Sequence, residues 1–221
     1  MTTVQQLADA QVHIGHRTGK WNPKMRPYIA GKADGAHVLD LQQTSTALAA
    51  AVSFLQACKK EHKQVLFVGT KPQASFVLQQ LAVGNDKLLY VDEKWSPGLI
   101  TNFNELRTRI DQYLRLKDQF ATDEILKYTK KEVAVFRKEL EKLDRVYHGV
   151  AGIRKKADAL VVLDAVGNRN AIDEAVQSGV PVIALVDSNA DPDGVTYPIP
   201  ANDDSIPALT FVTKTLIDAL A

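Results

Sequence analysis

The segment from residue 10 to residue 33 combines positive charge with aromatic side chains, and it contains no acidic residue. Its five basic residues are Arg17, Lys20, Lys24, Arg26 and Lys32. Ammonium and guanidinium groups bind phosphate oxygens, so this pattern is typical of a phosphate-binding arm rather than of a catalytic site. Glycines and prolines interrupt the segment, and we therefore expect an irregular loop and not a continuous helix. We call residues 10–33 the basic arm.

Charge is segregated along the rest of the chain, which the net charge of +1 conceals. Basic residues outnumber acidic ones by fourteen to nine in residues 105–156, whereas residues 157–221 contain two basic residues and ten acidic ones. This asymmetry favours two basic surfaces directed at one partner and an acidic end directed elsewhere. The alternative is that the acidic end is a solvated face.

A second candidate for phosphate chemistry is the sequence VGTK, in which Gly69, Thr70 and Lys71 follow an apolar run. Open parallel sheets bind phosphates at such positions, beside the N-terminus of the next helix. The sequence lacks the further glycines of the Walker and dinucleotide motifs, which let the backbone approach a phosphate. A small α/β enzyme that binds a phosphorylated ligand at Gly69–Lys71 is therefore kept as the alternative function.

Metal and nucleophile chemistry have little support in the residue pattern. Carboxylates gather in DSNADPDG, residues 187–194, and in NDD, residues 202–204, and oxygen ligands of this kind suit Mg²⁺. We instead expect Asn202 to cap a helix that runs to Leu220, with Asp203 and Asp204 in its first turn. The five histidines lack metal-ligand spacing, and there is a single cysteine. We expect no metal, no cofactor and no catalytic residue.

Short apolar runs alternate with helical patterns, which predicts a parallel sheet. The runs are QVLFVG at 64–69, LLYV at 88–91, ALVVLD at 159–164 and VPVIALVD at 180–187. Helices are expected over residues 44–60, from Pro72 onward and near residues 171–178. Because these runs are apolar throughout, both faces of each strand should be buried, and we predict a doubly wound α/β sandwich of three layers. Residues 28–41 read as two short strands joined by a turn.

Residues 103–147 break this rhythm. Apolar side chains recur there at spacings of three and four, from Phe103 to Tyr113 and from Val133 to Leu143, which predicts two helices with a coiled-coil seam. Thr129 and Glu132 have the spacing of a capping box, so the second helix should begin there. We expect an antiparallel helical hairpin inserted into a sandwich domain made of residues 1–102, which include the basic arm, and residues 148–221.

Composition and the start of the sequence bear on location. The chain is 45% hydrophobic and 24% charged, as in ordinary globular proteins. No apolar stretch approaches the roughly 18 residues that suggest a membrane span, and the first residues show no signal or transit pattern. We expect a cytoplasmic protein without membrane contact, and the plastid stroma is kept as an alternative.

Several segments occur in the order of the signature segments of one family. They are QLADAQVHIGHRTGKWNPKMRPYI, AHVLDLQQT, VLFVGTK, KWSPGLITNF, FRKELEKL and VDSNADPDGVTYPIPANDD. From about residue 6 to residue 220 the chain thus resembles bacterial ribosomal protein S2, the second protein of the small ribosomal subunit. The resemblance implies a flavodoxin-like parallel sheet with an inserted helical hairpin.

The same resemblance implies a structural role in translation and no reaction. It implies binding to small-subunit ribosomal RNA and to neighbouring ribosomal proteins, among them the large messenger-binding protein, and no small-molecule substrate. Matched residue by residue, Lys20, Trp21 and Lys24 belong to the family's basic loop, and Trp95 and Asn102 belong to its tryptophan segment.

Charge and resemblance together give the expected RNA contacts. These are Arg17, Lys20, Trp21, Lys24, Arg26, Lys94, Trp95, Asn102, Arg107 and Arg109. Lys and Arg neutralise phosphates with release of counterions, and each tryptophan either stacks on an unpaired base or packs against the sheet. Asn102 is either a ligand or a helix cap, and the hairpin cations are either RNA contacts, above all near the hairpin base, or solvated charges. A protein-interaction scaffold that uses the hairpin for recognition is a further alternative.

Overall fold

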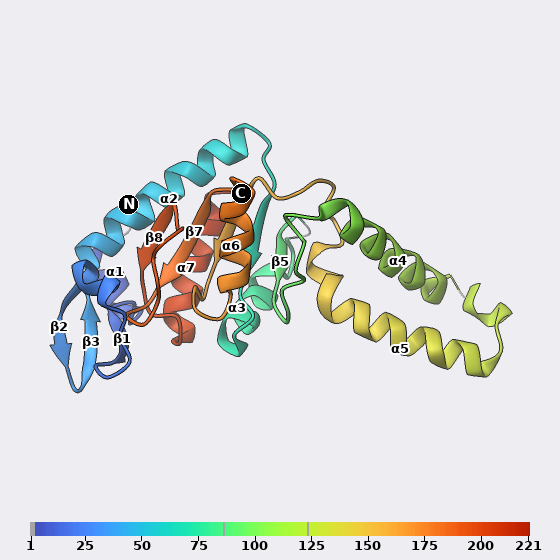
Figure 1. The fold of residues 1–221 in the computed structure, drawn as a ribbon, viewed down its shortest axis with the longest axis horizontal. Helices are drawn as coiled ribbons and strands as arrows, with labels where there is room; N and C mark the ends of the chain where they lie inside the picture. Colours follow the sequence, from blue (N-terminus) through green and yellow to red (C-terminus); the bar gives the residue numbers. More distant parts are fainter. Residues whose placement is uncertain (1–2, 86, 123) are drawn as a thin grey trace.

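A five-stranded parallel sheet forms the centre of the computed structural model, which describes residues 3–85, 87–122 and 124–221 (Figure 1). Its strands are β4 (Val65–Val68), β5 (Leu89–Val91), β6 (Ala159–Val162), β7 (Val182–Val186) and β8 (Tyr197–Pro200). They lie in the order β5-β4-β6-β7-β8, and all neighbouring strands are parallel. Numbered along the chain, this is the 2-1-3-4-5 order of flavodoxin-like sheets. The four predicted apolar runs are confirmed as β4, β5, β6 and β7.

Helices cover both faces of this sheet. Successive side chains of each strand point to opposite faces, and the side chains on both faces are apolar. Phe67 belongs to an apolar cluster with Leu48 and Val212, whereas its neighbour Leu66 belongs to a second cluster with Ile172. The first cluster lies under α2 (Leu41–Lys60), α3 (Pro72–Ala82) and α7 (Ile206–Asp218). The second lies under α6 (Arg169–Gln177) and the segments that flank it. The predicted three-layer α/β arrangement is therefore confirmed.

The two short strands predicted within residues 28–41 are confirmed, whereas the irregular loop expected for the basic arm is wrong, because the arm contains more regular structure. It contains β1 (Ile14–Arg17), the 3-10 helix η1 (Pro23–Tyr28) and β2 (Ile29–Ala33). The two strands flank β3 (Ala36–Leu39) in an antiparallel sheet of order β1-β3-β2. Asp34 and Gly35 both have positive φ angles, 49° and 77°, which is the backbone of a tight hairpin turn. A short helix, α1 (Val4–Asp9), precedes the arm and packs on α2.

A pair of helices extends away from the sheet on the β5 side (Figure 1). It consists of α4 (Phe103–Ala121) and α5 (Lys130–Tyr147), joined through the 3-10 helix η2 (Glu124–Lys127), and we call residues 103–147 the two-helix segment. Thr129 and Glu132 form the predicted capping box at the start of α5. Tyr113 of α4 is fully buried, and its hydroxyl donates to the carboxylate of Asp144 in α5 at 2.7 Å. Burial and this carboxylate raise the pKa of Tyr113, so the hydroxyl remains a donor.

An ion pair fixes the base of the two-helix segment to the sheet. His148, in the 3-10 helix η3 (His148–Val150), places Nε2 at 3.2 Å from the carboxylate of Asp92, which follows β5. The other ring nitrogen lies 2.7 Å from the carbonyl oxygen of Asp144, so the doubly protonated ring donates in both directions. The bond to Asp92 outweighs burial and raises the pKa of His148 to about 9. Gln79 of α3 donates to the second oxygen of Asp92 at 2.6 Å.

No helix within the described residues has the length and apolar character needed to cross a lipid bilayer.

The His148 pair predicts a pH dependence of folding. The pKa of His148 is higher in the folded protein than in the unfolded chain. The ion pair therefore stabilises the fold fully below about pH 6.5, and this stabilisation is lost as the pH rises through about 9. Replacement by His148→Gln should remove about 1–2 kcal/mol of unfolding free energy near pH 6 and progressively less toward pH 10. Urea unfolding of both proteins across this range measures the difference. The exposed His62→Asn is the control and should follow the parent curve, and a pH-independent loss for His148→Gln would contradict the assignment.

Candidate nucleic-acid interface

The basic arm presents part of its charge to solvent. Arg17, Lys20 and Arg26 are exposed and lie on β1, on the following turn and in η1. Lys24 is exposed as well, but its ammonium group lies 2.8 Å from a carboxylate oxygen of Asp191 and 2.5 Å from one of Asp193. The bonds to Asp191 and Asp193 raise the pKa of Lys24. Three of the four cations expected to contact RNA in this arm are therefore available to a phosphate, and the fourth is neutralised within the protein.

The two tryptophans have different environments. Trp21 is 39% exposed, and its ring lies 5.4 Å from that of the buried His37 at a tilt of 38°. A partly exposed indole can stack on a base. Trp95 is 7% exposed, and its indole N–H donates to the carboxylate of Glu174 at 3.0 Å. Of the two roles open from sequence, packing therefore fits Trp95, whereas base stacking is sterically open to Trp21.

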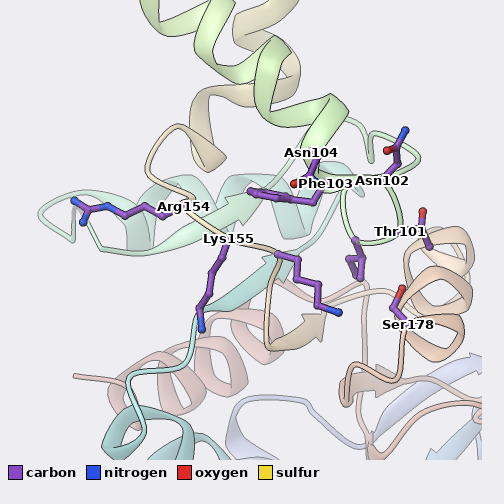
Figure 2. Close-up of a pocket in the computed structure, with 9 residues that line it drawn as sticks. Thr101, Asn102, Phe103, Asn104, Arg154, Lys155 and Ser178 are labelled. Atoms are coloured by element: carbon purple, nitrogen blue, oxygen red, sulfur yellow. The ribbon is translucent and has the colours of Figure 1, made fainter.

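A second positive surface is a cleft of about 500 Å³ at the base of the two-helix segment (Figure 2). Its lining residues are Ile100, Thr101, Asn102, Phe103, Asn104, Arg154, Lys155, Lys156 and Ser178. Figure 2 shows Thr101 and Ser178 on one side and Arg154 and Lys155 on the other. All three cations of this lining are exposed, although Lys155 pairs with Asp158 at 2.7 Å, and none of the described residues that line the cleft carries a carboxylate. We call this surface the basic cleft.

Local structure explains how the cleft residues are placed. Asn102 occupies the N-cap position of α4, but its side chain makes no capping bond and is exposed in the cleft lining. The predicted alternative of a helix cap therefore holds for its position and not for its side chain. Arg107 donates to the carbonyl oxygen of Ile153, and its Nε lies 3.1 Å from Asp111. Arg107 thus joins α4 to the segment that carries the cleft cations.

The expected RNA contacts do not form one site. The basic arm lies at the β8 end of the sheet, whereas α4 and the segment that joins it to β5 lie at the β5 end (Figure 1). Trp95, Asn102 and Arg107 belong to this second group of elements. Lys94 and Arg109 are exposed near this second group. The set expected from sequence omits Arg154, Lys155 and Lys156. The signal that could have added them is the run of three cations in HGVAGIRKK.

The acidic end of the chain holds the basic arm in place. The backbone N–H of His16 donates to Ser188 Oγ at 2.9 Å, and its ring nitrogens lie 3.1 Å from Asp187 and 3.2 Å from Asp204. The hydrogen bond to Asp187 is the main cause of the raised pKa of His16. Lys71 bonds to Asp203 at 2.9 Å and also contacts Asp204. The sequence suggested that the acidic end either faces a different partner from the basic surfaces or is a solvated face. Neither expectation included these bonds within the protein.

The expectation for Asn202 and its neighbours needs correction as well. The helix begins at Ile206 with Ser205 as its N-cap residue, so Asp203 and Asp204 precede it. Asn202 closes the turn before the helix, because its side-chain oxygen accepts from the N–H groups of Asp204 and Ser205. Asp203 is buried, and burial together with the nearby Asp187 raises its pKa to about 7. These carboxylates are therefore ion-pair partners and not first-turn helix charges.

Ligand atoms of His16, Asp203 and Asp204 lie within 4.8 Å of one another, which is close enough for one cation. Imidazole and carboxylate donors suit a divalent metal ion. Lys71 already neutralises both carboxylates in this arrangement. Sequence spacing does not reveal the cluster, because His16 comes from β1 and the two aspartates from the loop after β8.

The geometry of Gly69–Lys71 does not favour a phosphate site. A Cβ atom at Gly69 would lie 2.8 Å from the Cβ of Ala74, so the glycine is explained by close packing of α3 on the sheet. The Thr70 hydroxyl bonds to Asn168 at 3.0 Å, and the Lys71 ammonium group is bound to two carboxylates. A phosphate at this position would have to displace Lys71 and would then face those carboxylates.

Comparison with known proteins gives a consistent result. A family model described as "Ribosomal protein S2" matches residues 7–221. A protein named small ribosomal subunit protein uS2 from Coprothermobacter proteolyticus is 44% identical over an alignment of 223 positions, which covers 100% of this chain and 82% of the relative. Proteins of the same name from Dictyoglomus thermophilum and Petrotoga mobilis are each 40% identical. The alignment with the Dictyoglomus protein covers 98% of this chain and 88% of the relative. The alignment with the Petrotoga protein covers 100% of this chain and 76% of the relative.

The Lys71 pair predicts a second pH-dependent stability effect. Asp203 has a folded pKa above its unfolded value, so ionising it destabilises the fold as the pH rises through about 7, and Lys71 opposes this cost. Lys71→Met should therefore cost about 2 kcal/mol near pH 8 and clearly less near pH 5, where Asp203 is protonated. Chemical unfolding at both pH values measures the loss. Lys63→Met breaks the exposed Lys63–Glu61 pair and should cost under about 0.5 kcal/mol at either pH. An equal loss for Lys71→Met at both pH values would refute this account.

Proposed function

Because the chain belongs to the ribosomal protein S2 family, we propose that it is a structural component of the small ribosomal subunit that binds ribosomal RNA and neighbouring ribosomal proteins. The family match over residues 7–221 is the observation on which this proposal rests. The family is structural, and the chain is not an enzyme. The bonds that already engage Thr70 and Lys71 leave the alternative of a phosphorylated substrate at Gly69–Lys71 without support.

The two positive surfaces are proposed to bind RNA phosphates. On the basic arm, Arg17, Lys20 and Arg26 supply charge, and Trp21 stacks on an unpaired base. At the basic cleft, Arg154 and Lys156 supply charge beside Asn102. Exposed cations of this kind bind phosphates with release of counterions, so the affinity depends steeply on salt. Because the surfaces lie at opposite ends of the sheet, they contact separate RNA segments (Figure 1).

Among the remaining contacts expected from sequence, the structure supports different roles. Lys94 and Arg109 are exposed and are proposed as auxiliary phosphate contacts near the basic cleft. Lys24, Trp95 and Arg107 make internal bonds and are proposed to support the two surfaces rather than to bind RNA.

The two-helix segment is proposed to be an inserted antiparallel coiled-coil hairpin. Its helices begin at Phe103 and end at Tyr147, which supports a division into a sandwich of residues 1–102 and 148–221 and an insertion of residues 103–147. The exposed apolar side chains Leu126 and Val135 suit contact with a protein neighbour. The large messenger-binding protein of the small subunit is proposed as one such neighbour, on the family resemblance alone. The relatives named above are bacterial, which favours a ribosome in the bacterial cytoplasm, and no observation supports a plastid location.

Removal of charge from the basic arm tests the first surface. The triple variant Arg17→Gln, Lys20→Gln, Arg26→Gln should weaken binding to small-subunit ribosomal RNA, and the slope of log K against log salt should shrink by about one per lost phosphate contact. Filter binding between about 50 and 200 mM salt measures this slope. The matched control removes three exposed lysines elsewhere, Lys59→Gln, Lys87→Gln and Lys214→Gln, and should leave the slope unchanged. Equal slopes for the parent and the arm variant would exclude the arm as an RNA surface. A complex of this protein with a partner that survives nuclease treatment would instead indicate recognition of a protein.

Removal of charge from the basic cleft tests whether the surfaces act independently. The double variant Arg154→Gln, Lys156→Gln should lower the slope by up to about two. Because the surfaces are far apart, its loss of binding free energy should add to that of the arm variant within about 0.5 kcal/mol. The combined five-residue variant, measured in the same salt series, gives the sum. A combined loss no larger than that of either variant alone would show that the two surfaces contribute to one shared contact.

A further inference from the structure

Glu174 of α6 binds the irregular segment that leads from β5 to α4. Its Oε1 accepts from the indole N–H of Trp95 at 3.0 Å and from the backbone N–H of Gly98 at 2.9 Å. Its Oε2 accepts from the backbone N–H of Ile100 at 3.4 Å and from the hydroxyl of Thr101 at 3.3 Å. One carboxylate thus receives four donors from residues 95–101, which we call the tryptophan loop.

The tryptophan loop has no strand or helix to determine its path. Gly98 has a φ angle of 96°, a conformation that other residues rarely adopt, and the N–H of Asn102 donates back to its carbonyl oxygen at 2.7 Å. Without the carboxylate, the N–H groups of Gly98 and Ile100 would each lose this acceptor. The bonds to Glu174 therefore select one conformation of a segment that could adopt several.

The end of the tryptophan loop forms one wall of the basic cleft. Ile100 and Thr101 line the cleft directly, and the next residues, Asn102 and Phe103, begin α4 and continue the wall. Figure 2 shows Thr101 and Asn102 next to the start of α4. Any shift of the loop would therefore move the wall that faces Arg154 and Lys156.

We propose that Glu174 is a positioning residue that shapes the basic cleft for RNA. This inference rests on the function proposed above. Glu174 is anionic and lies beside a surface that binds phosphates, so by charge alone its removal should strengthen binding. Through geometry its removal should weaken binding, because the tryptophan loop loses its shared acceptor. The two effects have opposite signs, which makes the proposal testable.

The decisive comparison is between two neutralising variants of the same helix. Glu174→Gln removes the charge and replaces one acceptor oxygen with an amide donor, which opposes the N–H groups of the loop. Asp173→Asn removes the same charge one residue earlier, where the carboxylate is exposed and pairs with Arg169. The full-length parent and both variants are titrated with small-subunit ribosomal RNA at several salt concentrations. We expect binding about five- to tenfold weaker for Glu174→Gln, with a smaller salt slope, and binding equal to or slightly tighter than the parent for Asp173→Asn.

A second readout follows the loop without RNA. In a Trp21→Phe background the remaining tryptophan is Trp95, and Glu174→Gln should shift its fluorescence to the red as the indole loses its partner and becomes hydrated. A purely structural role would lower the melting temperature but leave RNA affinity unchanged well below it. Trp95→Phe removes one of the four donors to Glu174 and should weaken RNA binding about two- to threefold. If Glu174→Gln does not fold, this variant tests the positioning role in its place.

The outcomes separate this inference from the proposed function. If the parent does not bind RNA, the proposed function fails. If the parent binds and folded Glu174→Gln binds as tightly or more tightly, the positioning role is overturned and the function stands. Binding that weakens for Glu174→Gln but not for Asp173→Asn, together with the fluorescence shift, establishes the role.

Discussion

The attraction between the acidic end of the chain and its own basic arm determines where the arm lies. The carboxylates involved follow β7 and β8 at the carboxyl edge of the parallel sheet, and their partners come from the first third of the chain. His16 bridges Asp187 and Asp204, and Lys24 bridges Asp191 and Asp193. These contacts close loops of more than 150 residues, which carries an entropic cost that a single exposed pair does not repay. Several pairs, together with the backbone bond from Asn22 to Ser188, hold the arm against the sheet.

This internal use of charge divides the cations into two groups. Lys24, Lys71 and Arg107 bind acceptors within the protein, and their side chains are therefore not free to follow a polyanion. Arg17, Lys20, Arg26, Arg154 and Lys156 are exposed. A phosphate backbone would compete poorly for the first group, because each lost internal bond would leave a carboxylate unpaired beside the phosphate. The net charge of +1 is thus consistent with polyanion binding, since the acidic residues are placed where they support the arm.

How far the sequence predicts the fold depends on the range of the interactions. Each of β4, β6 and β7 is a short apolar run bounded by polar residues or glycine, and burial on both faces is enough to identify such strands. β8 escapes prediction because Pro198 and Pro200 are unusual in a strand, and they are tolerated at the edge of the sheet. Apart from the strand predicted near its end, the arm was expected to be irregular for the same reason, although Pro23 and Pro27 lie within η1 and leave β1 free. Proline and glycine therefore indicate local breaks correctly and hide the regular structure between them.

The functional surfaces are less predictable, because their properties arise from contacts between distant segments. Trp21 and Trp95 each lie near a lysine in the sequence, and only the position of Glu174 on α6 shows that Trp95 is an internal donor. The same holds for Asn102, whose position caps α4 while its side chain lines a cleft completed by residues 154–156. The base of the two-helix segment is fixed through Asp92 and His148, which are 56 residues apart in sequence. The sequence shows where the cations are in the chain. Which of them are paired within the protein depends on carboxylates that only the folded chain brings beside them.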